Sequence, residues 1–145
     1  MSLEQWAKNG WLRPHKSSRQ EIANLLEIVD RDLKDAESNI SSDWQFGIAY
    51  NAALKLCTIL LHASGYRPEQ KLGHYRTVTA LPLILGEEQN DNAEYLDVCR
   101  GKRNTVEYDA AGAVTRDEAR ELISFAKEMR QGVLDWLKKS HPNLC

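Results

Sequence analysis

The sequence predicts an all-α fold, an up-and-down bundle of four to five helices. Apolar residues recur at intervals of three and four through several long segments, the spacing that gathers side chains on one face of a helix. Three segments begin with Ser or Thr followed three residues later by Glu or Gln, which is the capping-box pattern of a helix start. The sequence has no sustained alternation of apolar and polar residues and no internal repeat, which argues against strands and solenoids.

The first predicted helix spans about 19–38. It starts with the pair Ser18 and Glu21, in which side chains and backbone satisfy each other's free donors. The apolar positions on its inner face are Ile22, Leu25, Leu26, Val29 and Leu33. Residues 1–17 show no clear periodicity, so we expect an arm or a short helix packed on the body of the domain.

The second predicted helix, about 43–64, is expected to be central and buried. It starts with the pair Ser42 and Gln45, and Gly65 followed by Pro68 supplies a stop. Its apolar positions keep the helical period throughout: Phe46, Ala49, Tyr50, Ala53, Leu56, Cys57, Leu60 and Leu61.

The third predicted helix, residues 74–85, is shorter. Its apolar positions are Tyr75, Val78, Leu81 and Leu85. Pro82 lacks a backbone N–H group and should kink this helix. The polar residues 86–91 predict a loop.

The last two predicted helices follow this loop. The fourth ends near Asp109, and its apolar positions are Leu96, Cys99 and Val106. Residues 110–114 form the next turn. The fifth starts with the pair Thr115 and Glu118 and ends before Pro142. Its inner face carries Ala119, Leu122, Ile123, Ala126, Met129, Val133, Trp136 and Leu137.

Length and composition predict one soluble domain covering residues 1–145. The formal net charge of −2 gives no general attraction to nucleic acid, so any such contact must come from a local cluster. Cys57, Cys99 and Cys145 are an odd number without a close pair, which suits a reducing cytoplasm. We expect no signal peptide, no membrane span and a cytoplasmic location.

The end of the fourth predicted helix carries the clearest chemical signal. Arg103 lies four residues after Cys99, at a position where the helical stripe requires an apolar side chain. Such a charge is costly unless it is paired or faces a groove or a partner. Arg100, Asn104 and Tyr108 follow one another at intervals of four and form a polar ridge beside it.

Two interpretations of this segment remain open from spacing alone. In one, Arg103 pairs with Glu107 one turn further on and reaches the surface, while Tyr108 covers the core with its hydroxyl in water. In the other, Arg100, Arg103, Asn104 and Tyr108 form an anion-binding or RNA-binding site.

The segment resembles the motif of the HEPN family, which has arginine, a polar residue, three further residues and a histidine before one more long helix. Here it reads Arg103, Asn104, Thr105, Val106, Glu107, Tyr108, with tyrosine in place of the histidine. The resemblance extends to the Ala-rich segment 49–65 and to Gly73-His74-Tyr75.

The resemblance implies a homodimer that brings two such motifs together across a groove. It also implies metal-independent RNA cleavage, in which arginine holds the scissile phosphate and histidine assists the ribose 2′-hydroxyl. Arg103 and Tyr108 are therefore the catalytic candidates. Histidine exchanges protons near neutral pH, whereas tyrosine, with a pKa near 10, stays a neutral donor. We therefore expect a non-catalytic or weakly catalytic protein.

Histidines outside the motif offer less. His74 is a candidate substitute base, although a polar residue opening a helix is the commoner explanation. His15 and His62 have no partner at the sequence spacing of metal ligands, and no cysteine pair has the spacing of a zinc site. We predict neither a metal nor a cofactor.

The leading hypothesis is a HEPN-like dimer that binds RNA, a nucleotide or a protein. The resemblance implies a toxin–antitoxin or defence setting, with a nucleotidyltransferase, toxin or antitoxin as candidate protein partner. One alternative is an active metal-independent endoribonuclease that uses Arg103 with Tyr108 or another residue in place of histidine. The other is a structural or adaptor bundle.

Overall fold

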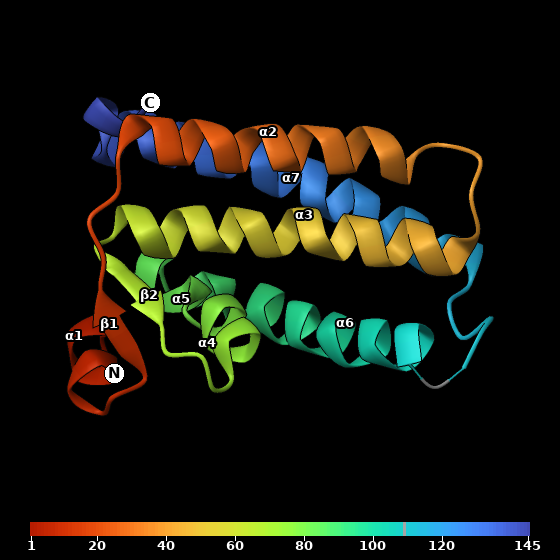
Figure 1. The fold of residues 1–145 in the computed structure, drawn as a ribbon, viewed down its shortest axis with the longest axis horizontal. Coiled ribbons are helices and arrows are strands. Elements are labelled where there is room, and N and C mark those ends of the chain that lie inside the picture. The colour runs from red at the N-terminus through yellow and green to blue at the C-terminus, as the bar shows by residue number, and fades with distance from the viewer. Residues whose placement is uncertain (109) are drawn as a thin grey trace.

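A computed structural model confirms the all-α prediction (Figure 1). It describes the backbone of residues 1–108 and 110–145, and the side chains of these residues except Tyr108. The bundle is built from four long helices: α2 (Arg19–Ala36), α3 (Ser42–Ala63), α6 (Asn90–Tyr108) and α7 (Arg116–Ser140). In Figure 1, α3 lies between α2 and α6, and α7 lies behind α2 and α3.

Short elements fill one end of the bundle. In chain order they are α1 (Leu3–Lys8), β1 (Leu12–Pro14), β2 (Tyr66–Pro68), α4 (Gly73–Thr79), α5 (Leu81–Leu85) and the 3-10 turns Glu87–Gln89 and Pro142–Leu144. The N-terminal segment, which holds α1 and β1, packs through a small apolar cluster of its own. The buried members of that cluster are Trp6, Leu12, Leu61 and Ala80.

The helix starts follow the predicted capping pairs, with one shift. Thr115 forms a full capping box with Glu118, and the hydroxyl of Ser18 accepts a hydrogen bond from the backbone N–H of Glu21. For α3 the prediction was one residue late. Ser41 is the cap, and its hydroxyl accepts from the backbone N–H of Trp44, so that Ser42 is already helical.

The expectation of no strands was wrong for two short segments. β1 pairs antiparallel with β2, with Leu12 opposite Pro68 and Pro14 opposite Tyr66. Each strand has three residues and ends in proline, so neither is long enough to show alternation in the sequence. The pairing ties the N-terminal segment to the chain that leaves α3.

The kink predicted at Pro82 is present. α4 ends at Thr79, and Pro82 lies in the first turn of α5, where its missing N–H is tolerated. The loop predicted over 86–91 is only partly correct, because a 3-10 turn forms there and α6 already begins at Asn90. Gly86, with φ of 113°, ends α5 and precedes the 3-10 turn that leads into α6.

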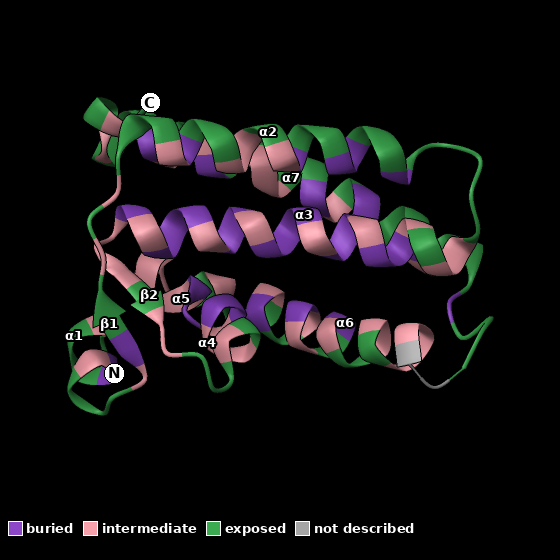
Figure 2. Cartoon of the chain, viewed as in Figure 1, coloured by how far each residue is buried: buried purple, intermediate pink, exposed green. Residues whose placement is uncertain are grey.

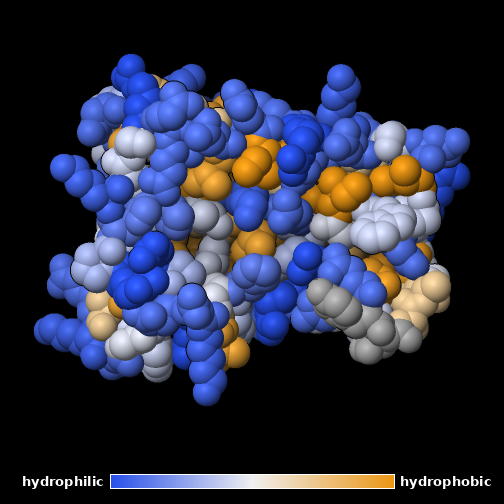
Figure 3. Space-filling model, in the orientation of Figure 1, coloured by the Kyte–Doolittle hydropathy of each residue, from blue (hydrophilic) through white to orange (hydrophobic). Residues whose placement is uncertain are grey.

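The core forms around α3, which carries buried residues in every turn from Phe46 to Ala63 (Figure 2). α3 packs against α2, α6 and α7. Tyr50 is the largest fully buried side chain. The face that carries α2, α3 and α6 is mainly hydrophilic, and apolar atoms show in the seam between α2 and α3 (Figure 3).

Among the described residues, α3 is the one helix long and apolar enough to cross a membrane by length and composition. Its most apolar window has a mean hydropathy of 1.3, and 67% of that window is buried inside the bundle. The central helix of a soluble domain has the same properties, because it is apolar on every side.

Candidate functional site

Arg103 lies half-buried between α6 and the core. Its side chain is 22% exposed, and its guanidinium carbon lies 5.6 Å from the ring centroid of Tyr50. Its Nε lies 3.3 Å from Oε1 of Glu107, one turn further along α6. This contact lacks hydrogen-bond geometry, and Nε is shielded from solvent without a hydrogen-bond partner among the described residues. The ion pair with Glu107 is therefore present, but it does not give Nε of Arg103 a hydrogen bond.

Arg100 and Asn104 form the outer part of the predicted ridge. Nε of Arg100 donates a 2.9 Å hydrogen bond to Oδ1 of Asp97, and its guanidinium lies 5.6 Å from the ring centroid of Tyr75 on α4. Asn104 is exposed. Tyr108 is the last residue of α6, and its side chain lies outside the described part of the structure.

Lys55 adds to the positive charge of α6 from another element, and the imidazole of His74 lies within range of these charges. Lys55 lies on α3 and His74 in the first turn of α4. Burial lowers the pKa of His74 below its ordinary value, and the positive charges of Arg103, Lys55 and Arg100 lower it further. Lys55 and His74 line the same cavity, and each of the three charges lies within electrostatic range of the His74 imidazole. We call Lys55, His74, Arg100 and Arg103 the basic cluster.

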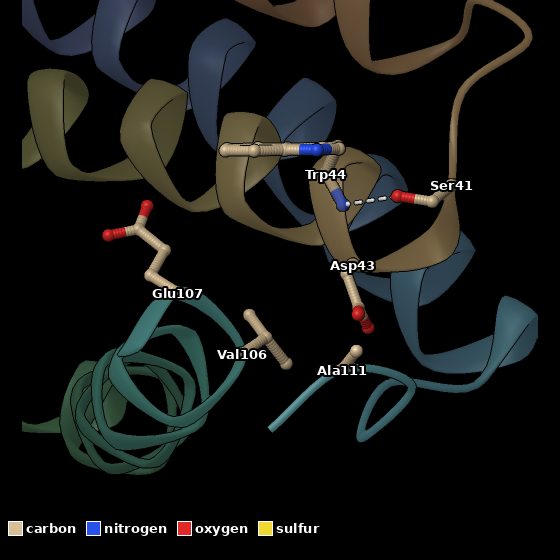
Figure 4. A pocket seen from close by; sticks show the side chains of 6 residues that line it. All are labelled: Ser41, Asp43, Trp44, Val106, Glu107 and Ala111. Carbon is tan, nitrogen blue, oxygen red and sulfur yellow. Dashed lines mark hydrogen bonds between the residues drawn. The ribbon is translucent and has the colours of Figure 1, made fainter. Parts of the chain in front are cut away.

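A pocket of about 640 Å³ opens between the start of α3 and the end of α6 (Figure 4). Its lining residues are Ser41, Asp43, Trp44, Val106, Glu107 and Ala111. Trp44 is 60% exposed, so most of its indole is available to a ligand. An exposed indole beside an apolar side chain such as Val106 can stack on a planar group.

Two carboxylates belong to this Trp44 pocket. Oδ2 of Asp43 accepts a 2.7 Å hydrogen bond from the backbone N–H of Gly112, which ties the chain after α6 to α3. Oδ1 of Asp43 is buried and has no hydrogen-bond partner in the part of the chain that the structure describes. Glu107 lines the pocket and also pairs with Arg103. The pocket and the basic cluster therefore meet at Glu107.

A second cluster lies near the ends of three other segments. It consists of His15 after β1, Glu21 in the first turn of α2 and His62 in the last turn of α3. Nε2 of His15 lies 2.8 Å from Oε1 of Glu21, and Nδ1 of His62 lies 2.9 Å from the same oxygen. The two imidazole centroids are 4.3 Å apart. We call these three residues the His–Glu–His cluster.

The Glu21 carboxylate and the His62 imidazole in this cluster respond differently to burial. Burial raises the pKa of Glu21, but the hydrogen bonds with His15 and His62 outweigh it and leave that pKa below its ordinary value. Burial lowers the pKa of His62 by more than its hydrogen bond with Glu21 raises it. An anionic carboxylate beside a neutral imidazole is therefore the favoured state near neutral pH.

Sequence reasoning named Arg100, Arg103, Asn104 and, as a candidate substitute base, His74, but it missed Lys55 and Trp44. Lys55 and Trp44 lie on α3, which the sequence marked only as a buried helix. A lysine within the apolar sequence of α3, and a tryptophan in its first turn, were the features that could have indicated a surface there. His15 and His62 were judged by their spacing along the chain, which says nothing about segments that meet through the pairing of β1 with β2.

No family model, curated protein or solved structure matches this chain.

Proposed function

We propose that this chain is a HEPN-like dimer that binds single-stranded RNA at the basic cluster and the Trp44 pocket, without efficient ribonuclease activity. The half-buried guanidinium of Arg103 carries the proposal. Its Nε has no hydrogen-bond acceptor among the described residues, and a desolvated donor of this kind costs about 1–3 kcal/mol when it is left unsatisfied. A phosphate oxygen can bind the part of this side chain that remains open to solvent, because the Arg103 side chain is 22% exposed.

The charge around Arg103 supports a phosphate ligand. Arg100 and Lys55 lie near enough to His74 to act on it together with Arg103, and arginine's planar fork matches a phosphate group. Asp97 and Glu107 each pair with one of the arginines, so a ligand must compete with these carboxylates. We therefore expect modest affinity with a marked salt dependence.

The Trp44 pocket supports a ligand with a base beside its phosphate. Base stacking on an aromatic side chain contributes about 1–3 kcal/mol per base and tolerates any sequence. Because Glu107 belongs to both the pocket and the ion pair with Arg103, one nucleotide can contact both surfaces.

The dimeric and non-catalytic parts of the proposal depend on the HEPN resemblance. Tyrosine at position 108 replaces the group that would exchange protons near neutral pH, and losing such a group typically costs about 10²- to 10⁴-fold in rate. The same resemblance makes a nucleotidyltransferase, a toxin or an antitoxin the class of protein to test as a partner.

Fluorescence anisotropy with a short labelled single-stranded RNA tests the binding function. We expect the wild type to bind. A plot of the logarithm of the association constant against the logarithm of the salt concentration should have a slope of about −2, the value for three phosphate contacts on a single strand. Arg103→Ala should abolish binding. Trp44→Ala should weaken it about 5- to 150-fold, which corresponds to the 1–3 kcal/mol of one stacked base.

Arg130→Ala is the matched control, because it removes the same charge from a side chain of similar exposure on α7. Arg130 pairs with Asp30 on α2, away from both proposed surfaces. Its loss should leave RNA binding unchanged. Equal affinity of the Arg103→Ala and Arg130→Ala variants would contradict the proposed site and favour the adaptor alternative.

A further inference from the structure

We propose that the His–Glu–His cluster is a binding site for a divalent transition-metal ion, with zinc as its best match. One ligand atom from each of His15, Glu21 and His62 lies within 4.8 Å of the other two. Two imidazole nitrogens and one carboxylate oxygen form a ligand set that zinc accepts with a fourth position left open. None of the three ligands belongs to the RNA-binding surface proposed above, although His62 lines one cavity together with Lys55 and His74 of the basic cluster.

Each ligand is held by a contact of its own. The backbone N–H of His15 donates a 2.8 Å hydrogen bond to the carbonyl of Gly65, which continues the pairing of β1 with β2. His62 lies in the last turn of α3, and its side chain is 17% exposed. Ser18 caps α2 and fixes the first turn that carries Glu21. The three side chains therefore converge without a ligand to gather them, which lowers the entropic cost of metal binding.

Glu21 does not make the hydrogen bond that its sequence position favours. In α1 and α7 the equivalent Gln5 and Glu118 side chains accept from the backbone N–H of their cap residues. In α2 the hydroxyl of Ser18 accepts from Glu21, but the Glu21 carboxylate turns to the histidines instead. Both its oxygens lie within 3.0 Å of Nε2 of His15. The carboxylate is thus directed at the cluster and not at its own helix.

The spacing of the ligand atoms suits a tetrahedral ion. Ligands bound to zinc at about 2.0–2.2 Å lie about 3.3 Å from one another. The present separations of 2.8 and 2.9 Å from Glu21 to the two imidazoles need to widen by only a few tenths of an ångström. Each imidazole would present a lone pair to the metal and carry its proton on the other ring nitrogen.

The fourth coordination position has space on one side of His62. That imidazole lines a cavity of about 190 Å³ together with Lys55, Thr58, Gln70 and His74. A water molecule or a small anion fits there. The positive charge of Arg67 also acts on His62 and opposes a cation, but Arg67 is exposed and can extend into solvent.

Isothermal titration of the chelator-treated full chain with zinc chloride tests the site, and cobalt(II) absorption reports the coordination number. Both are carried out in the Cys145→Ser background, because Cys145 is an exposed thiol that can bind zinc by itself. We expect one zinc ion per chain. Glu21→Gln and His62→Gln should each weaken binding by more than about tenfold. The melting temperature should rise with zinc in the parent protein and not in these variants.

His141→Gln is the matched control, because it removes a histidine that follows α7 and is not one of the three proposed ligands. It should bind zinc as the parent does. Glu21→Gln also keeps the backbone hydrogen bond to Ser18, so a folded variant is expected, and its circular dichroism spectrum verifies this. Absence of zinc binding by the parent, or unchanged binding in a folded Glu21→Gln, His62→Gln double variant, would overturn the proposal. Neither result would bear on RNA binding.

Discussion

The carboxylate of Glu118 at the start of α7 accepts a hydrogen bond from Nζ of Lys102 on α6. The same carboxylate accepts from the backbone N–H of Thr115 and so closes the capping box of α7. The side chain of Glu118 therefore both closes the start of α7 and connects α7 to α6. The two contacts lower the pKa of Glu118 to about 2, with the hydrogen bond from Lys102 as the larger cause.

Replacing Glu118 with Gln should make the free energy of unfolding less dependent on pH between about 2 and 4.5. The pKa of the folded carboxyl lies below its ordinary value of 4.5, so its contribution is present above about pH 4.5 and is lost as the pH falls towards 2. We expect Glu118→Gln to be less stable than the wild type at pH 7 and equally stable near pH 2. Urea denaturation across this range measures the difference. A constant difference at every pH would show that the charge of Glu118 contributes nothing.

Asp32 is a buried carboxylate held between α2 and α3. Nδ2 of Asn51 on α3 donates a 2.6 Å hydrogen bond to its Oδ2, and Arg31 donates to its Oδ1. Asn51→Ala should leave that buried oxygen unsatisfied and lower the free energy of unfolding by about 1–3 kcal/mol. Urea denaturation followed by circular dichroism measures the change. Gln131→Ala, which removes a similar but exposed contact on α7, should change stability by less than about 0.5 kcal/mol.

The three cysteines should differ sharply in reactivity. Burial raises the pKa of Cys57 to about 12 and that of Cys99 to about 11, so neither forms thiolate at neutral pH. Cys145 is exposed. Ellman's reagent should therefore titrate one thiol per native chain at pH 8 and three in denaturant, and Cys145→Ser should remove the native signal. Rapid reaction of more than one native thiol would mean that the core around α3 opens.

The proposed dimer should depend on α6, which carries an exposed apolar side chain. Val98 is 70% exposed. Sedimentation at micromolar concentration should give a species near twice the 16.5 kDa chain mass, and Val98→Glu should convert it to the monomer. Ile40→Glu, at an exposed apolar position outside α6, is the matched control. A wild-type monomer at about 100 µM would exclude association stronger than about 6 kcal/mol.

The sequence predicted the long helices because each one buries a continuous stripe. α2 and α7 start at the predicted caps, and α3 starts one residue before the predicted position because either Ser41 or Ser42 can serve as a cap. β1 and β2 could not be predicted in this way, because a three-residue pair is stabilised by the contacts around it and not by its own pattern.

The site was predictable only where it lies within one helix. Arg103 interrupts an apolar stripe, and Arg100 and Asn104 follow at a spacing of four beside it, which periodicity reveals directly. Lys55 and His74 reach the same surface from α3 and α4, and the sequence contains no signal for that approach. The convergence of His15, Glu21 and His62 depends on the strand pairing that the sequence did not indicate.

Restoring histidine at position 108 tests the non-catalytic part of the proposal. The Tyr108→His variant supplies a side chain with a pKa near 6.5 at the position where the resembling motif carries its histidine. We expect the wild type to leave RNA uncut in the presence of chelator, and Tyr108→His to cleave slowly and leave 2′,3′-cyclic phosphate ends. Electrophoresis of labelled RNA with end-group analysis makes the comparison.

The cleavage gained in Tyr108→His should require Arg103, so the Tyr108→His, Arg103→Ala double variant should be inactive, and Tyr108→Phe should resemble the wild type. Chelator-resistant cleavage by the wild type that is lost in Arg103→Ala would instead establish the endoribonuclease alternative, with tyrosine accepted in the active site.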